Sequence, residues 1–331
     1  MTSRTAGTPE NRQRWSVALT RIDTATVGPG VALVAMFLVF SILSPYFLTR
    51  SNVTNVLVQS APLLILAAGQ TYALLMGGLD LSQGSIISLV SVVSAGVLLR
   101  HGVILGAAAG LAAGLAIGLV NGLLIGRARI QPFIVTLGTL YMTAGAAMVY
   151  SDGSSIFGLP RPAVDYFFWF GGGFAGPVPV PVLIAVALIA VAHIILTRTR
   201  FGRHVFAVGG SESVAVMSGI DIGHVKMLIY LVSGGCASVA GFMMSGRVIS
   251  GQPLLGAGDI LLQSIGAVII GGTSVFGGHG GVLRTVLGVF VVAFMVNGLN
   301  LLAIDTFAQQ IIVGAIIILS VWVSSLRRRR L

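Results

Sequence analysis

Residues 103–126 read VILGAAAGLAAGLAIGLVNGLLIG and carry no charged side chain. A helix needs about 20 predominantly apolar residues to cross the hydrocarbon core of a bilayer. This run therefore predicts a membrane-spanning helix, and its many glycines favour close packing against neighbouring helices.

Nine further apolar runs lie on either side of this one. They fall near 28–48, 54–76, 82–99, 130–150, 177–197, 226–246, 257–273, 283–303 and 307–326. The runs at 82–99 and 257–273 are short and interrupted by glycine. The pattern predicts an all-α, polytopic membrane protein with about ten transmembrane helices, of which some are short and broken at glycines.

The composition agrees with a protein that is largely surrounded by lipid. The 331 residues are 56% hydrophobic and only 8% charged, with a mean hydropathy of +1.00, whereas soluble domains carry roughly 25% charged residues. The net charge of +10 could suggest nucleic acid as a partner. The basic residues stand at the ends of the apolar runs, however, and no aromatic-basic binding motif accompanies them, so we expect no nucleic-acid partner.

The basic residues also predict the orientation of the chain. With the N-terminus in the cytoplasm, ten spans return the C-terminus to the same side. Fifteen of the nineteen Lys and Arg residues then fall inside, and only Arg50, Arg100, Arg161 and Arg247 fall outside, which is the expected inside excess of positive charge. We therefore predict a cytoplasmic tail at 1–27, a transmembrane domain at 28–326 and a basic cytoplasmic tail at 327–331. We interpret the first apolar run as a membrane helix and not as a cleaved signal peptide.

No enzyme motif is present. The single lysine, Lys226, stands between Val225 and Met227, so the chain lacks the Gly-Lys-Ser/Thr of a nucleotide-binding P-loop. There is no nucleophile elbow, no His-Glu-x-x-His pair, and the five histidines show no metal-ligand spacing. We therefore predict no catalytic residues, no metal site and no cofactor bound by this chain.

Two glycine-rich motifs interrupt the apolar pattern. In MGGLDLSQG (76–84), two glycines can end one helix, and Asp80 or Ser82 can cap the next. In GGTSVFGGHGG (271–281), six of eleven residues are glycine, beginning with Gly271 and Gly272 before Thr273. Both motifs predict helix breaks. Capping alone explains the first motif, and a functional role of its polar residues within the membrane is the alternative.

A third set consists of polar residues near or within the apolar runs. Such side chains can hydrogen-bond between helices, or they can line a path for a hydroxyl-rich solute. Interhelical packing is the simpler interpretation, and both remain open. The members are Asn121, Gln131, Thr136, Asn297 and Asn300.

The polar stretch 198–226 separates two long apolar runs and contains SVAVMSGI (213–220), which predicts a small helix closed by a glycine. It is either an ordinary solvated loop between two membrane helices or a docking surface for a partner.

Four segments, in this order along the chain, resemble the permeases of ribose-type ATP-binding cassette (ABC) importers. They are GGLDLSQG (77–84), QPFIVTLGT (131–139), VGGSESVAVMSGI (208–220) and GGTSVFGG (271–278). The third departs from the usual family pattern at Ser211, Ser213 and Val214. The resemblance covers about residues 50–326.

The resemblance implies that 198–226 is a coupling loop whose small helix docks onto a separate ATPase. The coupling residues would be Gly209, Gly210, Glu212, Ala215, Ser218, Gly219 and Ile220. The resemblance further implies three partners: an ATPase that holds ATP and Mg, an external sugar-binding protein, and a second permease subunit, identical or related. The protein would reside in a bacterial inner membrane.

On this resemblance, we expect the membrane permease of an ABC importer for a ribose-like monosaccharide or related polyol, which moves solute by alternating access. The alternative is an ion-coupled secondary transporter of a small polar solute. That alternative needs ionisable residues within the spans, but Asp80 and Asp259 fall at predicted helix ends, and the predicted helix interiors offer only His193.

Overall fold

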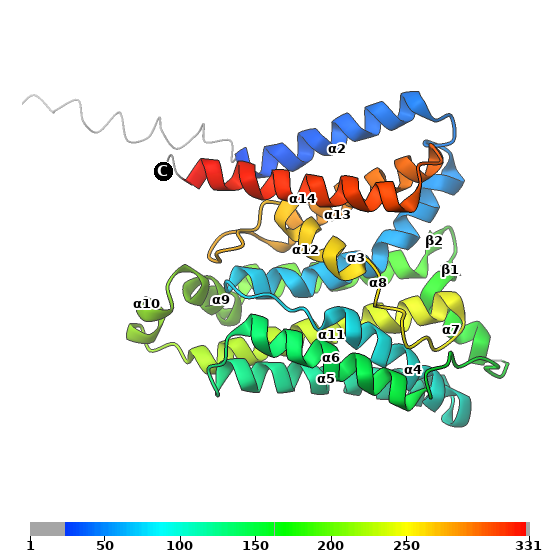
Figure 1. Ribbon diagram of the computed structural model, residues 1–331, viewed down its shortest axis with the longest axis horizontal. Coiled ribbons are helices and arrows are strands. Elements are labelled where there is room, and N and C mark those ends of the chain that lie inside the picture. Colours follow the sequence, from blue (N-terminus) through cyan, green and yellow to red (C-terminus); the bar gives the residue numbers. More distant parts are fainter. Residues whose placement is uncertain (1–23, 162, 329–331) are drawn as a thin grey trace, which may run out of the picture.

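The computed structural model describes residues 24–161 and 163–328, which form a helical bundle (Figure 1). Within these residues, seven helices are long and apolar enough to cross a membrane. They are α3 (Arg50–Leu75), α4 (Gln83–His101), α5 (Val103–Gly126), α6 (Pro132–Tyr150), α8 (Val180–Arg198), α11 (Ile222–Val248) and α13 (Val282–Leu301). This confirms the predicted fold class.

The three other predicted spans are also helical. They are α2 (Thr24–Leu43), α12 (Ile260–Ile270) and α14 (Thr306–Arg328), each with a shorter apolar portion. Helix α2 begins at Thr24, within the predicted tail, whereas residues 1–23 and 329–331 of the predicted tails lie outside the described residues.

Small elements mark the two ends of the bundle. At one end lie α9 (Arg200–Gly210) and α10 (Glu212–Met217), and we call this the α10 end. At the other lie α7 (Ala163–Gly172) and the antiparallel pair β1 (Phe174–Ala175) and β2 (Val178–Pro179), and we call this the α7 end (Figure 1). Helix α2 starts and α14 finishes at the α10 end (Figure 1).

Glycines along one face of α5 set how closely the central helices approach. They recur every fourth residue, at Gly106, Gly110, Gly114, Gly118, Gly122 and Gly126. A Cβ atom on Gly118 would lie 2.5 Å from the carbonyl oxygen of Tyr230, and one on Gly122 would lie 2.7 Å from Cα of Met227. Helix α5 therefore packs directly against the backbone of α11, as small residues allow in membrane bundles.

Two helix connections run partly inside the bundle. Residues 76–82 lead from the α10 end of α3 back to the start of α4, where Gln83 Nε2 donates to Ser233 Oγ. Ser233 stands eleven residues beyond the start of α11, which is about 16 Å along the helix. Helix α4 therefore begins well within the bundle.

The second internal connection, 249–259, enters from the α7 end and leads to α12. Its Gly256 packs against the backbone of Gly84 at the start of α4, and the Gly256 N–H donates to Ser88 Oγ at 3.0 Å. The eleven residues of α12 are about 16 Å long, roughly half of a 30 Å hydrocarbon core. The two breaks thus enter from opposite ends and meet inside the protein.

Candidate translocation and coupling site

Asp80 is the centre of a buried polar cluster at the first break. Its side chain is fully buried. Its Oδ1 accepts hydrogen bonds from the Ser82 N–H at 3.0 Å and from Ser82 Oγ at 2.6 Å, and its Oδ2 accepts one from Ser233 Oγ at 2.6 Å. The carboxylate thus ties the break to α11 and satisfies polar groups that cannot reach water.

Asn121 and Thr136 both form hydrogen bonds with residues of this break. Asn121 is fully buried on α5, and its Nδ2 donates to Ser82 Oγ at 2.9 Å. Thr136 on α6 donates to the carbonyl oxygens of Leu79 at 3.3 Å and Pro132 at 2.9 Å. Asn121 and Thr136 thus bind residues of the break, and the Thr136 bond to Pro132 lies within α6.

Gln131 lies apart from this cluster. It precedes α6 as its N-cap residue, its side chain is exposed, and it makes no capping hydrogen bond. A role for Gln131 in the path stays a prediction.

The two glycine motifs close their helices in the same way. After α3, the Gly77 N–H donates to Leu74 O at 2.8 Å and the Gly78 N–H to Ala73 O at 2.9 Å. After α12, the Gly272 N–H donates to Ile269 O at 2.9 Å and the Thr273 N–H to Val268 O at 3.2 Å. Gly77 and Gly272 have φ angles of 81° and 86°, as expected for left-handed residues that end helices.

Three segments then meet at the α10 end, and we call this contact the glycine junction: Leu75–Gly78, Gly209–Gly210 and Phe276–Gly278. The Gly278 N–H donates to Leu75 O at 2.8 Å. A Cβ atom on Gly209 would overlap Leu75 O, and one on Gly277 would lie 2.8 Å from Gly209 O. Helix α9 therefore contacts the first break and the loop 271–281 after α12 through the backbone.

Helix α10 follows directly and presents an apolar surface. Val214, Val216 and Met217 are exposed, and Met217 is 79% exposed. Ala215, which the sequence predicts as a contact residue, is only 2% exposed and packs against the core of the bundle. The sequence analysis missed the three apolar residues because a six-residue helix is too short for its periodicity to identify the outer face.

The remaining coupling residues surround this surface. Ser218, Gly219 and Glu212 are exposed, whereas Ile220 is partly buried against the core. Gly219 has a φ of 77° and ends the small helix. The Glu212 carboxylate lies 2.6 Å from Lys226 Nζ, so it contacts the start of α11.

Asp221 caps α11 at the end of the coupling loop. Its Oδ1 accepts a hydrogen bond from the His224 N–H at 3.0 Å. This bond is the main cause that lowers the pKa of the Asp221 carboxyl. The cap fixes the point at which the chain re-enters the bundle.

Asn297 and Asn300 lie away from the Asp80 cluster, near the α7 end of α13. Asn297 exchanges two hydrogen bonds with Asn52 of α3, at 2.9 and 2.8 Å. Asn300 Oδ1 accepts one from Gln309 Nε2 at 2.8 Å. Both asparagines join helices, and Asn297 also lines a cavity.

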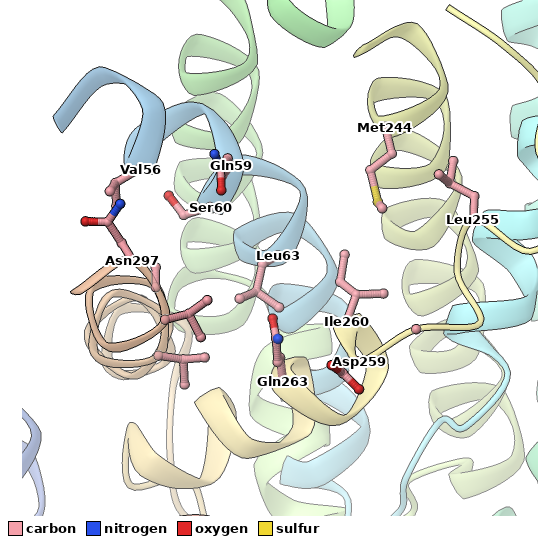
Figure 2. Close-up of a pocket in the computed structure, with 14 residues that line it drawn as sticks. Val56, Gln59, Ser60, Leu63, Met244, Leu255, Asp259, Ile260, Gln263 and Asn297 are labelled. Atoms are coloured by element: carbon pink, nitrogen blue, oxygen red, sulfur yellow. The ribbon is translucent and has the colours of Figure 1, made fainter. Parts of the chain in front are cut away.

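This cavity has a volume of about 360 Å³ and lies between α3, α11, α12 and α13 (Figure 2). Its polar lining includes Gln59, Ser60, Asp259 and Gln263 in addition to Asn297. The sequence analysis did not select Gln59 or Gln263, although glutamines within long apolar runs were an available signal.

Among the described residues, no group of three His, Cys, Asp or Glu side chains could hold an ion.

Comparisons with known proteins place these features in a family. Residues 52–321 match the family described as "Branched-chain amino acid transport system / permease component". The chain belongs to this permease family. It is a non-catalytic, multi-pass transport subunit of an ABC import system, and subunits of this kind bind no cofactor themselves. The match favours the importer interpretation over the ion-coupled transporter.

Individual relatives extend over most of the chain. It is 37% identical to the ribose import permease protein RbsC of Escherichia coli K12, with 89% of this chain and 92% of the relative aligned. It is 35% identical to the D-allose transport system permease protein AlsC of the same strain, over 86% of each chain. It is 33% identical to the L-arabinose transport system permease protein AraH of that strain, over 88% of each chain.

The Asp80 cluster predicts a loss of stability when the carboxylate is removed. Asp80→Ala leaves three buried donors without an acceptor, at about 1–3 kcal/mol each, so we expect a clearly lower thermal unfolding midpoint in detergent. Asp80→Asn keeps one oxygen, so its unfolding midpoint should fall between those of Asp80→Ala and the unaltered protein. Asp165→Ala, at an exposed position on α7, is the control and should change little. Equal midpoints for all four proteins would contradict the assignment.

Proposed function

We propose that this chain is the membrane permease of an ATP-driven importer of a neutral monosaccharide, such as a pentose or hexose. The lining of the cavity between α3 and α12 is the observation that supports this class of solute. Its lining contains amides, a serine and one carboxylate, but no Lys, Arg or His. A carboxylate substrate is held most strongly by a cationic side chain, whereas sugar hydroxyls need only neutral donors and acceptors. The relatives named for ribose, allose and arabinose support the same choice.

The proposed orientation places the α10 end in the cytoplasm. Of the thirteen Lys and Arg residues in the described part of the chain, nine stand at helix ends or loops of the α10 end. This excess of positive charge is expected on the cytoplasmic side. The transmembrane domain would then span 28–326, with the terminal segments 1–27 and 327–331 in the cytoplasm.

The proposed coupling route begins at α10. The exposed Val214, Val216 and Met217 would occupy a cleft of the ATPase, while the buried Ala215 would transmit the contact to the bundle. From there α9 leads to the glycine junction, and so to the first break and to the loop 271–281 after α12. The external binding protein would deliver solute at the α7 end, and a second permease subunit, identical or related, would complete the path.

The first test is co-purification of the ATPase with this chain from its native membrane in mild detergent. Met217→Asp places a charge on the apolar face of α10, and loss of a central apolar anchor costs about 2 kcal/mol or more. We expect the ratio of ATPase to permease to fall at least about tenfold.

Ser213→Ala is the matched control for this test, because it lies on the same helix and leaves the apolar face intact. Recovery of the unaltered chain without any ATPase in several detergents would count against the proposed function. An unchanged ratio for Met217→Asp would count against α10 as the docking element.

The glycine junction offers a second test with a neighbouring control. Gly209→Ala places a methyl group against Leu75 O, whereas Gly210→Ala meets no atom within 4 Å. We expect Gly209→Ala to reduce ATP-driven uptake at least about tenfold while the ATPase still co-purifies. Gly210→Ala should transport like the unaltered protein. Equal uptake by the two variants would show that the junction does not transmit motion.

A further inference from the structure

The cavity between α3 and α12 has two kinds of wall. Val56, Leu63, Ile260, Val292 and Val296 give it apolar surface. Figure 2 shows the Gln263 amide turned toward Leu63, with Gln59 one helical turn away on α3. Two amides therefore lie on either side of an apolar patch. The volume of about 360 Å³ falls within the range of small-molecule sites.

The depth of this cavity places it on a route across the membrane. Gln59 is nine residues from the start of α3, about 14 Å from the α7 end of that helix. Helix α12, which carries Gln263, itself begins inside the bundle after the second break. The cavity thus reaches the middle of the hydrophobic thickness and adjoins one of the two breaks.

The polar side chains of the lining differ in how far their hydrogen-bonding groups are occupied. Asn297 is paired with Asn52, Ser60 donates to Leu57 O, and Asp259 accepts from Gln310 Nε2 at 2.9 Å. Within residues 24–161 and 163–328, the structure shows no hydrogen bond to the side chain of Gln59 or Gln263. Gln59 is exposed and Gln263 is half-buried, so each amide offers two donor hydrogens and a carbonyl acceptor to a molecule in the cavity.

We infer that Gln59 and Gln263 are substrate-contact residues that hold the hydroxyl groups of a monosaccharide halfway through the membrane. The apolar patch around Leu63 would pack against the C–H face of the sugar ring. Asn297 and Ser60 would shape the wall, since their own hydrogen bonds are already made. This assignment rests on the proposed function and adds to it the residues that recognise the solute within the permease.

The test uses the complete importer in proteoliposomes, with the permease, its ATPase and the loaded binding protein. Gln263→Leu and Gln59→Leu keep the side-chain size and remove the hydrogen bonds. We expect about a 3- to 10-fold fall in sugar transported per ATP hydrolysed, which corresponds to the loss of one net hydrogen bond. Stimulation of the ATPase by the binding protein should be retained, because neither residue lies at the α10 end.

Two further variants make the result specific. Asn55→Leu lies one turn before Gln59 on α3 and does not line the cavity, so it should transport normally. Gln263→Asn keeps an amide on a shorter side chain and should recover part of the loss.

The possible outcomes separate the two claims. Normal sugar-to-ATP ratios in both leucine variants would overturn the assignment of Gln59 and Gln263 and leave the importer function intact. Equal losses in Asn55→Leu would also overturn it, because the effect would then be a general one of α3. An unaltered importer that carries none of D-ribose, D-allose or L-arabinose would overturn the proposed function, and this assignment with it.

Discussion

The structure depends on one constraint: a backbone that leaves the helical conformation inside a membrane protein must find partners for its polar groups within the protein. This chain leaves the helical conformation inside the bundle twice, at 76–82 and at 249–259. At the first break, Asp80 accepts from Ser82 and Ser233. At the second, Ser88 and Ser91 of α4 accept from the Gly256 and Gln252 N–H groups. The first break is therefore stabilised by α11, and the second is stabilised by α4, the helix that follows the first break.

Glycine makes this arrangement compact. The stripe on α5 brings that helix against the α11 backbone, and α11 supplies Ser233 to the first break. The glycine junction brings α9 against the ends of both broken segments. We propose that a force applied at α10 reaches the first break and the loop 271–281 at the end of α12 through these backbone contacts. Rigid contacts of this kind suit the proposed transmission of ATPase motion to a membrane path.

Much of the fold could be predicted from the sequence, because a membrane span is a local property. All ten apolar runs are helices, and the two that are short and glycine-broken lead from the two internal breaks. The position of the first break followed from the Asp80 motif, whereas the Gly271 motif marks the end of α12 and not the second break at 249–259. The depth of the two breaks could not be predicted, since it depends on contacts such as Gly84 with Gly256, which are far apart in the chain.

The candidate site was harder to predict for the same reason. Asn121 and Thr136 were selected as polar residues, but only the structure shows that they bond to the first break. That the Ala215 side chain faces the bundle depends on how α10 packs, which the sequence does not show. The cavity was missed because Gln59 and Gln263 are about two hundred residues apart in sequence and become neighbours only when α12 packs beside α3.

The central claim is that ATP hydrolysis by a partner drives a neutral sugar through this chain. The most direct measurement is uptake of a radiolabelled monosaccharide into proteoliposomes that contain the permease and its ATPase, with the binding protein outside and ATP inside. The account predicts uptake that requires both ATP and the binding protein and that is unaffected by ionophores. Uptake by the permease alone that ionophores abolish would contradict it.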